Sequence, residues 1–186
     1  DWSSDVCSSD LESIESMYDE YLAVPGVLSE IIKGDREEHA DAFIIACFGD
    51  PGLLAAKEVT EKPVIGIAQA AFTVAKMIAP NFSVVYVLDR SEQVVRESLH
   101  LHGVEQFCKS CRSTGLGVLD FDKDPETGLR ALAEQGRKCV EGDGAECVVL
   151  GCAGFVQFVD ALNQKLGVPV IDGVSPAVKF CEIGRA

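Results

Sequence analysis

Two cysteines in equivalent positions of an internal repeat are the residues whose type and spacing suit a chemical task. Each lies in a segment that reads as an apolar strand, a cysteine turn, a short amphipathic helix and a second strand written Pro-Val-Ile. Cys47 precedes Pro63 by 16 positions, and Cys152 precedes Pro169 by 17. If a pseudo-twofold axis relates the copies, the two thiols face one another. Two facing thiols can remove a proton from one face of a carbon and return one to the other.

The turn residues beside the two thiols complete the predicted site. A glycine follows each thiol after one residue, so that backbone N–H groups can approach a small anion and hold an enolate without a metal. Both thiols precede predicted helices, whose N-termini lower the pKa of a thiol from about 8.5. We interpret Asp50 as a helix N-cap or as an acceptor for a ring N–H. The predicted substrate-binding residues are Phe48, Gly49, Asp50, Gly151, Ala153 and Gly154.

Short apolar runs that alternate with helical patterns predict an α/β fold. Continuous Val/Ile runs indicate parallel strands joined by right-handed crossovers, with ligands expected beyond their carboxyl ends, where both cysteine turns stand. An opening helix carries Glu15 and Tyr18 on one face. The predicted strands are 42–46, 64–67, 83–88, 118–121, 147–150 and 168–171, and the predicted helices are 51–59, 69–78, 91–101, 125–141, 155–166 and the segment from 176 onward.

Composition excludes several classes of partner. The 186 residues include 16 Lys+Arg against 30 Asp+Glu, a net charge of -14 that repels polyphosphate, so we expect no nucleic-acid partner. No apolar run approaches the roughly 18 residues that a membrane span needs, which predicts a soluble cytoplasmic protein. The eight cysteines of this mid-sized α/β chain are expected to be reduced thiols.

Other candidate motifs have simpler structural readings. Cys108 and Cys111 have the C-x-x-C spacing of redox and zinc sites, but no second pair and no nearby His completes a zinc set. His100 and His102 fall on different faces near a helix C-terminus, where a capping role is ordinary. We therefore predict no metal site. The cysteines interpreted as packing residues are Cys139, Cys147 and Cys181.

The chain resembles a known family in six strings that occur in the same order. It resembles the hydantoin racemase group of the aspartate/glutamate racemase superfamily, which also includes allantoin racemases, over about Glu12 to Cys181. The resemblance implies two pseudo-symmetric α/β lobes, each with a four-stranded parallel sheet flanked by helices. It also implies cofactor-independent racemisation by Cys47 and Cys152 in the cleft between the lobes. The strings are SIESMYDEYLAVPGVL, DAFIIACFGDPGL, KPVIGIAQAAF, FSVVYVLDR, VVLGCAGF and GVPVIDGVSPAVK.

The resemblance also predicts the domain organisation. A first α/β lobe is expected over 12–80, completed by 173–181, and a second lobe over 81–172. The opening strand of the family, with its Asn-Pro-Asn turn, and the strand that follows it do not occur in the sequence. We therefore expect a first lobe without its first strands and a substrate site that lacks one wall, which puts the activity of the chain as it stands in question.

Two terminal segments do not fit the family pattern. Residues 1–11 have no periodicity, and residues 182–186 break off the last predicted helix. Both read as translated sequencing adapter, so we interpret them as foreign to the protein. Cys7 is therefore excluded from the predicted chemistry.

Three functions fit these observations. The leading one is a racemase of 5-substituted hydantoins or allantoin, which exchanges the proton on the carbon next to a carbonyl. A racemase of free aspartate or glutamate fits less well, because those enzymes carry Cys-Asn-Thr and Gly-Cys-Thr turns where this chain has Cys-Phe-Gly and Gly-Cys-Ala. The third is a non-catalytic small-molecule-binding protein or a thiol-redox protein that uses Cys108 and Cys111. For the leading function we expect a small-molecule substrate, no cofactor and a homo-oligomer.

Overall fold

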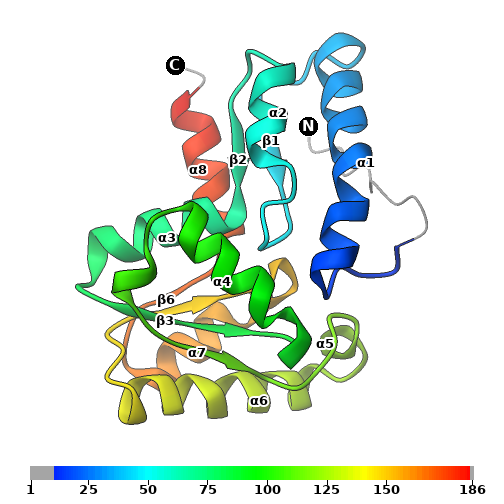
Figure 1. Ribbon diagram of the computed structural model, residues 1–186. Helices are drawn as coiled ribbons and strands as arrows, with labels where there is room; N and C mark the ends of the chain where they lie inside the picture. The colour runs from blue at the N-terminus through cyan, green and yellow to red at the C-terminus, as the bar shows by residue number, and fades with distance from the viewer. Residues whose placement is uncertain (1–10, 185–186) are drawn as a thin grey trace.

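The computed structural model describes residues 11–184, which form two parallel β-sheets flanked by helices (Figure 1). One sheet has two strands, in the order β1-β2, and the other has four, in the order β4-β3-β5-β6. The predicted α/β class is confirmed. The strands are β1 (Phe43–Ile45), β2 (Val64–Gly66), β3 (Phe82–Tyr86), β4 (Cys108–Ser113), β5 (Val148–Leu150) and β6 (Val170–Ile171).

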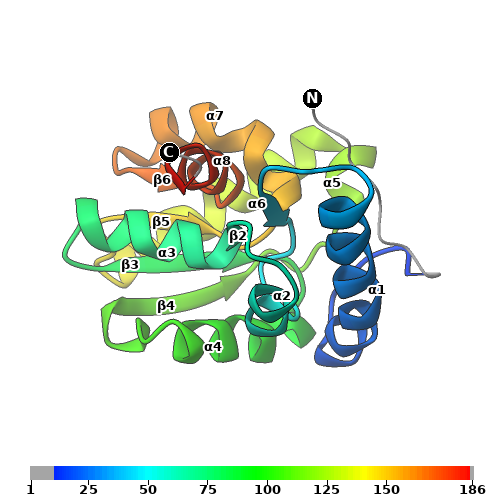
Figure 2. The same cartoon turned by 90° about the horizontal axis from the view of Figure 1, so that it is seen from above.

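Helices cover both faces of the four-stranded sheet, with α3 and α4 on one face and α6 and α7 on the other (Figure 1). Helix α1 packs beside α2 at the two-stranded sheet (Figure 2). The helices are α1 (Met17–Arg36), α2 (Leu53–Val59), α3 (Ile67–Ile78), α4 (Glu92–Leu101), α5 (Asp120–Lys123), α6 (Pro125–Arg137), α7 (Val159–Leu166) and α8 (Val174–Gly184), with short turns η1 (Asp89–Ser91), η2 (Glu105–Phe107), η3 (Lys138–Gly142) and η4 (Ala153–Phe158).

The central strand β3 explains why the sheet is covered on both sides. All five of its residues are buried, and neighbouring side chains alternate between the two faces. Val84 packs with α3 and α4, whereas Val85 packs with α6 and α7. A strand buried on both faces is apolar along its whole length, which is why this run could be predicted.

The repeat seen in the sequence appears in the structure as two parallel strand pairs. Strand β1 pairs with β2, and helix α2 connects them. Strand β5 pairs with β6, and η4 and α7 connect them. The helix that follows each strand pair packs against the other sheet. Helix α3 comes directly after β2 yet packs on β5 and β6, while α8 comes after β6 and packs on β1, β2 and α3. This exchange joins the two sheets, and it places the ends of β1 and β5 near each other.

Two sequence predictions about strands are wrong. The segment 118–121 is not a strand, because Asp120 accepts a hydrogen bond from the Gly117 N–H (3.0 Å) in a turn that leads into α5. Phe121 is buried from that helix instead. Strand β4 was not predicted. It is a half-buried edge strand with the polar sequence Cys-Lys-Ser-Cys-Arg-Ser, so it carries no apolar run.

The first and last helices test two further predictions, on the position of Glu15 and on the end of the last helix. Helix α1 begins at Met17 with Ser16 as its N-cap, so Glu15 precedes the helix rather than lying on it. Helix α8 continues through Glu182, which pairs with Lys179. The interpretation of 182–186 as a foreign segment stays a prediction, and Cys7 lies outside the described residues.

Candidate active site

The two predicted thiols line one cavity of about 190 Å³. Cys47 lies two residues beyond β1, and Cys152 lies two residues beyond β5. Both residues are half-buried. Because the carboxyl ends of parallel strands open at one edge of a sheet, the two equivalent turns converge there. The structure therefore brings together the two cysteines that the repeat singled out.

The cavity is mostly apolar, and its lining contains most of the predicted substrate-binding residues. Gly49 lines it from the Cys47 turn. Asp50, which was also predicted to bind the substrate, is not among the residues that line it. Among the described residues that line the cavity there is no Lys or Arg. The other predicted residues in the lining are Phe48, Gly151, Ala153 and Gly154, and the additional ones include Glu15, Tyr86, Ser91, Val94, Val95 and Val118.

Both cavity thiols have raised pKa values. Burial raises the pKa of Cys47 to about 12, although the backbone N–H of Gly49 acts in the opposite direction. Burial likewise raises the pKa of Cys152 to about 11, against the N–H of Gly154. The expectation of lowered pKa values is wrong, because α2 begins only at Leu53 and burial outweighs the backbone dipoles. Both groups are therefore thiols at neutral pH in the free protein.

These pKa values predict the alkylation behaviour of the chain. We expect iodoacetamide to modify Cys47 and Cys152 slowly at about pH 7, and about tenfold faster for each pH unit up to about pH 10, because the thiolate is the nucleophile. Cys111 is the internal control, since a hydrogen bond from Cys108 lowers its pKa. It should be modified first. Mass spectrometry of peptides measures each site. Equal rates of modification at Cys47, Cys152 and Cys111 at about pH 7 would contradict the raised pKa values of the two cavity thiols.

Asp50 caps a helix, which is one of the two roles predicted for it, but the helix is not the one that follows it in the chain. Its carboxylate accepts hydrogen bonds from the N–H groups of Ala68 (3.0 Å) and Gln69 (2.8 Å), so it caps α3 rather than the helix that follows it in the chain. Its Oδ2 also lies 3.0 Å from Nε2 of His102. A Cβ at Gly66 would overlap this carboxylate, so only glycine fits there. Asp50 is buried and fully engaged, and it holds the Cys47 turn against α3 and α4.

Glu15 is a buried acidic residue in the wall of the thiol cavity. Its Oε1 accepts from the Val118 N–H (2.9 Å), its other oxygen pairs with Arg90, and its carbonyl oxygen accepts from the Ser91 hydroxyl (2.7 Å). These bonds close one wall of the cavity. Tyr18, the other residue singled out in this segment, is 72% exposed.

The remaining cysteines lie away from the cavity. Cys108 and Cys111 are on β4, with their sulfur atoms 3.8 Å apart, and neither lines the cavity. Cys139 and Cys147 are completely buried and Cys181 nearly so, in agreement with the packing roles predicted for them. Within residues 11–184 there is no group of three or more His, Cys, Asp or Glu side chains that could hold a metal ion.

None of the helices in the described part of the chain combines the length and apolar character that crossing a membrane requires. The longest, α1, has 20 residues but carries acidic and basic residues in its first and last turns.

Comparison with known proteins identifies the family of the chain and supports its fold class. The family described as Asp/Glu/Hydantoin racemase matches residues 7–181. The hydantoin racemase of Pseudomonas sp. (strain NS671) is 53% identical over 170 residues, which cover 91% of this chain and 68% of that protein. The structure of an allantoin racemase from Klebsiella pneumoniae is similar with a TM-score of 0.89 and 42% identity, covering 93% of this chain and 70% of that one.

A more distant structure shares the fold alone. Unliganded arylmalonate decarboxylase has a TM-score of 0.66 at 16% identity and covers 89% of this chain and 76% of its own. The fold, shared with the allantoin racemase structure at 42% identity, thus defines the class of α/β racemase-like proteins. Within that class, this chain belongs to the Asp/Glu/hydantoin racemase family. It is an isomerase of the racemase type, so the non-catalytic and thiol-redox alternatives give way to this assignment.

Proposed function

We propose that the protein racemises 5-substituted hydantoins or allantoin by proton transfer between Cys47 and Cys152. The observation that carries this proposal is the placement of both thiols in one cavity, from equivalent positions of the repeat. The similarity to proteins named hydantoin racemase and allantoin racemase supports the choice of substrate. No cofactor is required by this chemistry, because the thiols supply both the base and the acid.

The raised pKa values suit the proposed proton transfer. The substrate carbon is a weak acid, and a thiolate whose conjugate acid has a pKa of about 11 or 12 is a strong base for it. One cysteine takes the proton as a thiolate, and the other gives a proton to the opposite face of the enolate as a thiol. The two roles are exchanged for the opposite enantiomer.

The backbone N–H groups of Gly49 and Gly154 act on the sulfur atoms in this scheme. Each N–H hydrogen-bonds to the thiol two residues before it and lowers its pKa, in opposition to the larger effect of burial. Hydrogen bonds to the charged form stabilise that form. The two glycine N–H groups therefore make a small thiolate population accessible inside an apolar cavity.

The lining of the cavity favours a neutral ring over a free amino acid. Val95 and Val118 contribute apolar surface, and the described lining offers no Lys or Arg to pair with an α-carboxylate. Burying an unpaired carboxylate in such a site is costly. A hydantoin ring has no such charge and presents carbonyl and N–H groups. The cavity therefore supports a cyclic diamide substrate better than aspartate or glutamate.

A comparison of three substrates tests this proposal. We expect enantiopure 5-benzylhydantoin or allantoin to lose optical rotation faster with the protein than without it, while L-aspartate keeps its configuration. Polarimetry measures the ring substrates, and chiral chromatography measures aspartate. The matched control is the same protein after alkylation of its cysteines at about pH 10, where both thiols should react. Racemisation of aspartate without racemisation of either ring substrate would overturn the proposed substrate class.

A further inference from the structure

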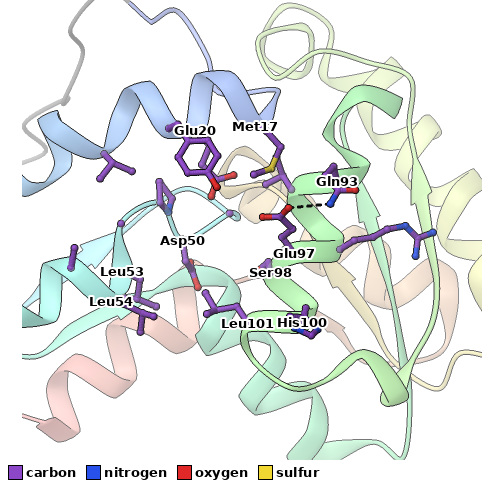
Figure 3. A pocket seen from close by; sticks show the side chains of 18 of the residues that line it. Met17, Glu20, Asp50, Leu53, Leu54, Gln93, Glu97, Ser98, His100 and Leu101 are labelled. Atoms are coloured by element: carbon purple, nitrogen blue, oxygen red, sulfur yellow. Dashed lines mark hydrogen bonds between the residues drawn. The ribbon is translucent and has the colours of Figure 1, made fainter.

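A second and larger cavity lies next to the thiol cavity. It has a volume of about 660 Å³ and is enclosed by α1, by the turn that follows Cys47 and by α4 (Figure 3). Gly49 and Val94 line both cavities. If the stereocentre of a substrate lies beside Cys47, its substituent therefore needs to pass only Gly49 to enter the second cavity.

Two buried polar atoms at this cavity have no hydrogen-bond partner among the described residues. They are Oε2 of Glu20, on α1, and the hydroxyl of Ser98, on α4, whose side chain is only 2% exposed. Both residues line the cavity, and Figure 3 shows them on its opposite sides. Leaving a buried polar group without a hydrogen-bond partner is unfavourable. These two atoms are therefore poised to accept hydrogen bonds from a ligand.

The charges that face Glu20 are negative. Its carboxyl group lies directly against Gly49, where a Cβ would overlap it, so glycine is required for this approach. Burial, and then the charges of Asp50 and Glu97, raise the pKa of Glu20 to about 7. Glu97 carries its own negative charge into the cavity and accepts one bond, from Gln93 (3.1 Å). The cavity therefore contains several acidic side chains, one of which lies against Gly49.

The basic side chains around the cavity are already paired with other acids. Arg96 is bonded to Glu92 (2.8 Å), and His100 is bonded to Glu105 (2.9 Å). They therefore leave the charge at Glu20 uncompensated. The rest of the lining is apolar and includes the exposed side chains Tyr21, Leu54 and Leu101, together with the buried Leu53. An amphipathic group with an apolar stem and a cationic, hydrogen-bond-donating end fits this combination.

We propose that this cavity receives the substituent at the stereocentre of the substrate and selects substituents that end in an ammonium group, with Glu20 as the specificity-determining residue. The inference rests on the proposed racemisation at Cys47 and Cys152. The apolar walls hold the methylene stem, and the Glu20 carboxylate and Ser98 hydroxyl accept hydrogen bonds from the ammonium group. Glu97 adds to the attraction. No bond is formed or broken in this cavity.

A pair of matched hydantoins tests the proposal. Enantiopure 5-(4-aminobutyl)hydantoin and 5-pentylhydantoin have substituents of similar length, and only the first carries an ammonium group. We expect kcat/KM to be about tenfold higher for the aminobutyl compound, as expected for a charge-assisted hydrogen bond. The difference should lie in KM. Glu20→Gln should abolish the preference, whereas Glu30→Gln, at a partly exposed position of the same helix outside the cavity, should leave it intact.

The pH dependence separates a binding role of Glu20 from a structural one. Glu20 must be ionised to attract the ammonium group, so the preference should be greater at about pH 8 than at about pH 6, on either side of its pKa. Equal kcat/KM values for the two hydantoins, or a preference that survives Glu20→Gln, would overturn the proposal. If neither hydantoin is racemised, the proposed function fails. Isothermal titration calorimetry then tests the cavity separately: tighter binding of the aminobutyl compound supports the role of Glu20, and equal affinities contradict it.

Discussion

Replacing either Cys47 or Cys152 by serine is expected to lower kcat/KM for racemisation by on the order of 10²- to 10⁴-fold, the usual contribution of a positioned acid or base. Serine keeps the shape of the side chain, but its hydroxyl ionises far less readily than a thiol. Each cysteine serves one face of the substrate carbon in the proposed mechanism. Loss of either therefore stops the exchange of configuration in both directions.

Polarimetry of an enantiopure hydantoin measures this effect, and Cys108→Ser supplies the matched control. Cys108 is also a half-buried thiol, but it lies on β4 outside the cavity. Its replacement should leave racemisation essentially unchanged. Thermal unfolding of the three variants checks that each is folded. If Cys47→Ser and Cys152→Ser both racemised as fast as Cys108→Ser, the two-cysteine mechanism would be wrong.

Replacing Asp50 by alanine is expected to lower the free energy of unfolding by about 3 to 5 kcal/mol, because it leaves several buried hydrogen-bonding groups unsatisfied at roughly 1 to 3 kcal/mol each. The substitution leaves the N–H groups of Ala68 and Gln69 without their acceptor and the ring of His102 without its partner. A space also opens beside Gly66. Because Asp50 orients the turn that carries Cys47, the variant should also lose racemase activity.

Denaturant unfolding measures the change, with Asp124→Ala as the control. Asp124 is an N-cap as well, accepting from the Thr127 N–H (3.1 Å) at the start of α6, but it is exposed to solvent. Its loss should cost about 1 kcal/mol, as is typical of a surface cap. An Asp50→Ala variant that is no less stable than Asp124→Ala would show that the buried cap does not hold the turn as described.

The sequence indicated the features of the fold that depend on local pattern. Buried parallel strands need apolar side chains on both faces, so runs such as Ser-Val-Val-Tyr in β3 stood out. The repeat revealed the equivalence of Cys47 and Cys152, because a duplicated strand and turn keeps its residue types. The edge strand β4 did not stand out, because an edge position with half-buried side chains accepts polar residues.

The parts of the site that could not be predicted depend on contacts between distant segments. Asp50 meets His102 across 52 positions of the chain, and Glu15 meets Val118 across 103. No local pattern distinguishes such an acid from a solvent-exposed one. The raised thiol pKa values were missed for the same reason, since burial is a property of the assembled fold and outweighs the backbone N–H groups that the turn provides.

The most direct test of the two-cysteine account is deuterium exchange at the stereocentre, measured in deuterated water with each pure enantiomer of a 5-substituted hydantoin. In a serine variant, the remaining cysteine can still remove and return a proton on its own face. Cys47→Ser and Cys152→Ser should therefore each exchange one enantiomer without racemising it, and the two variants should act on opposite enantiomers. Proton NMR follows the loss of the stereocentre signal. Exchange of the same enantiomer by both variants, or of both enantiomers by either, would contradict the account.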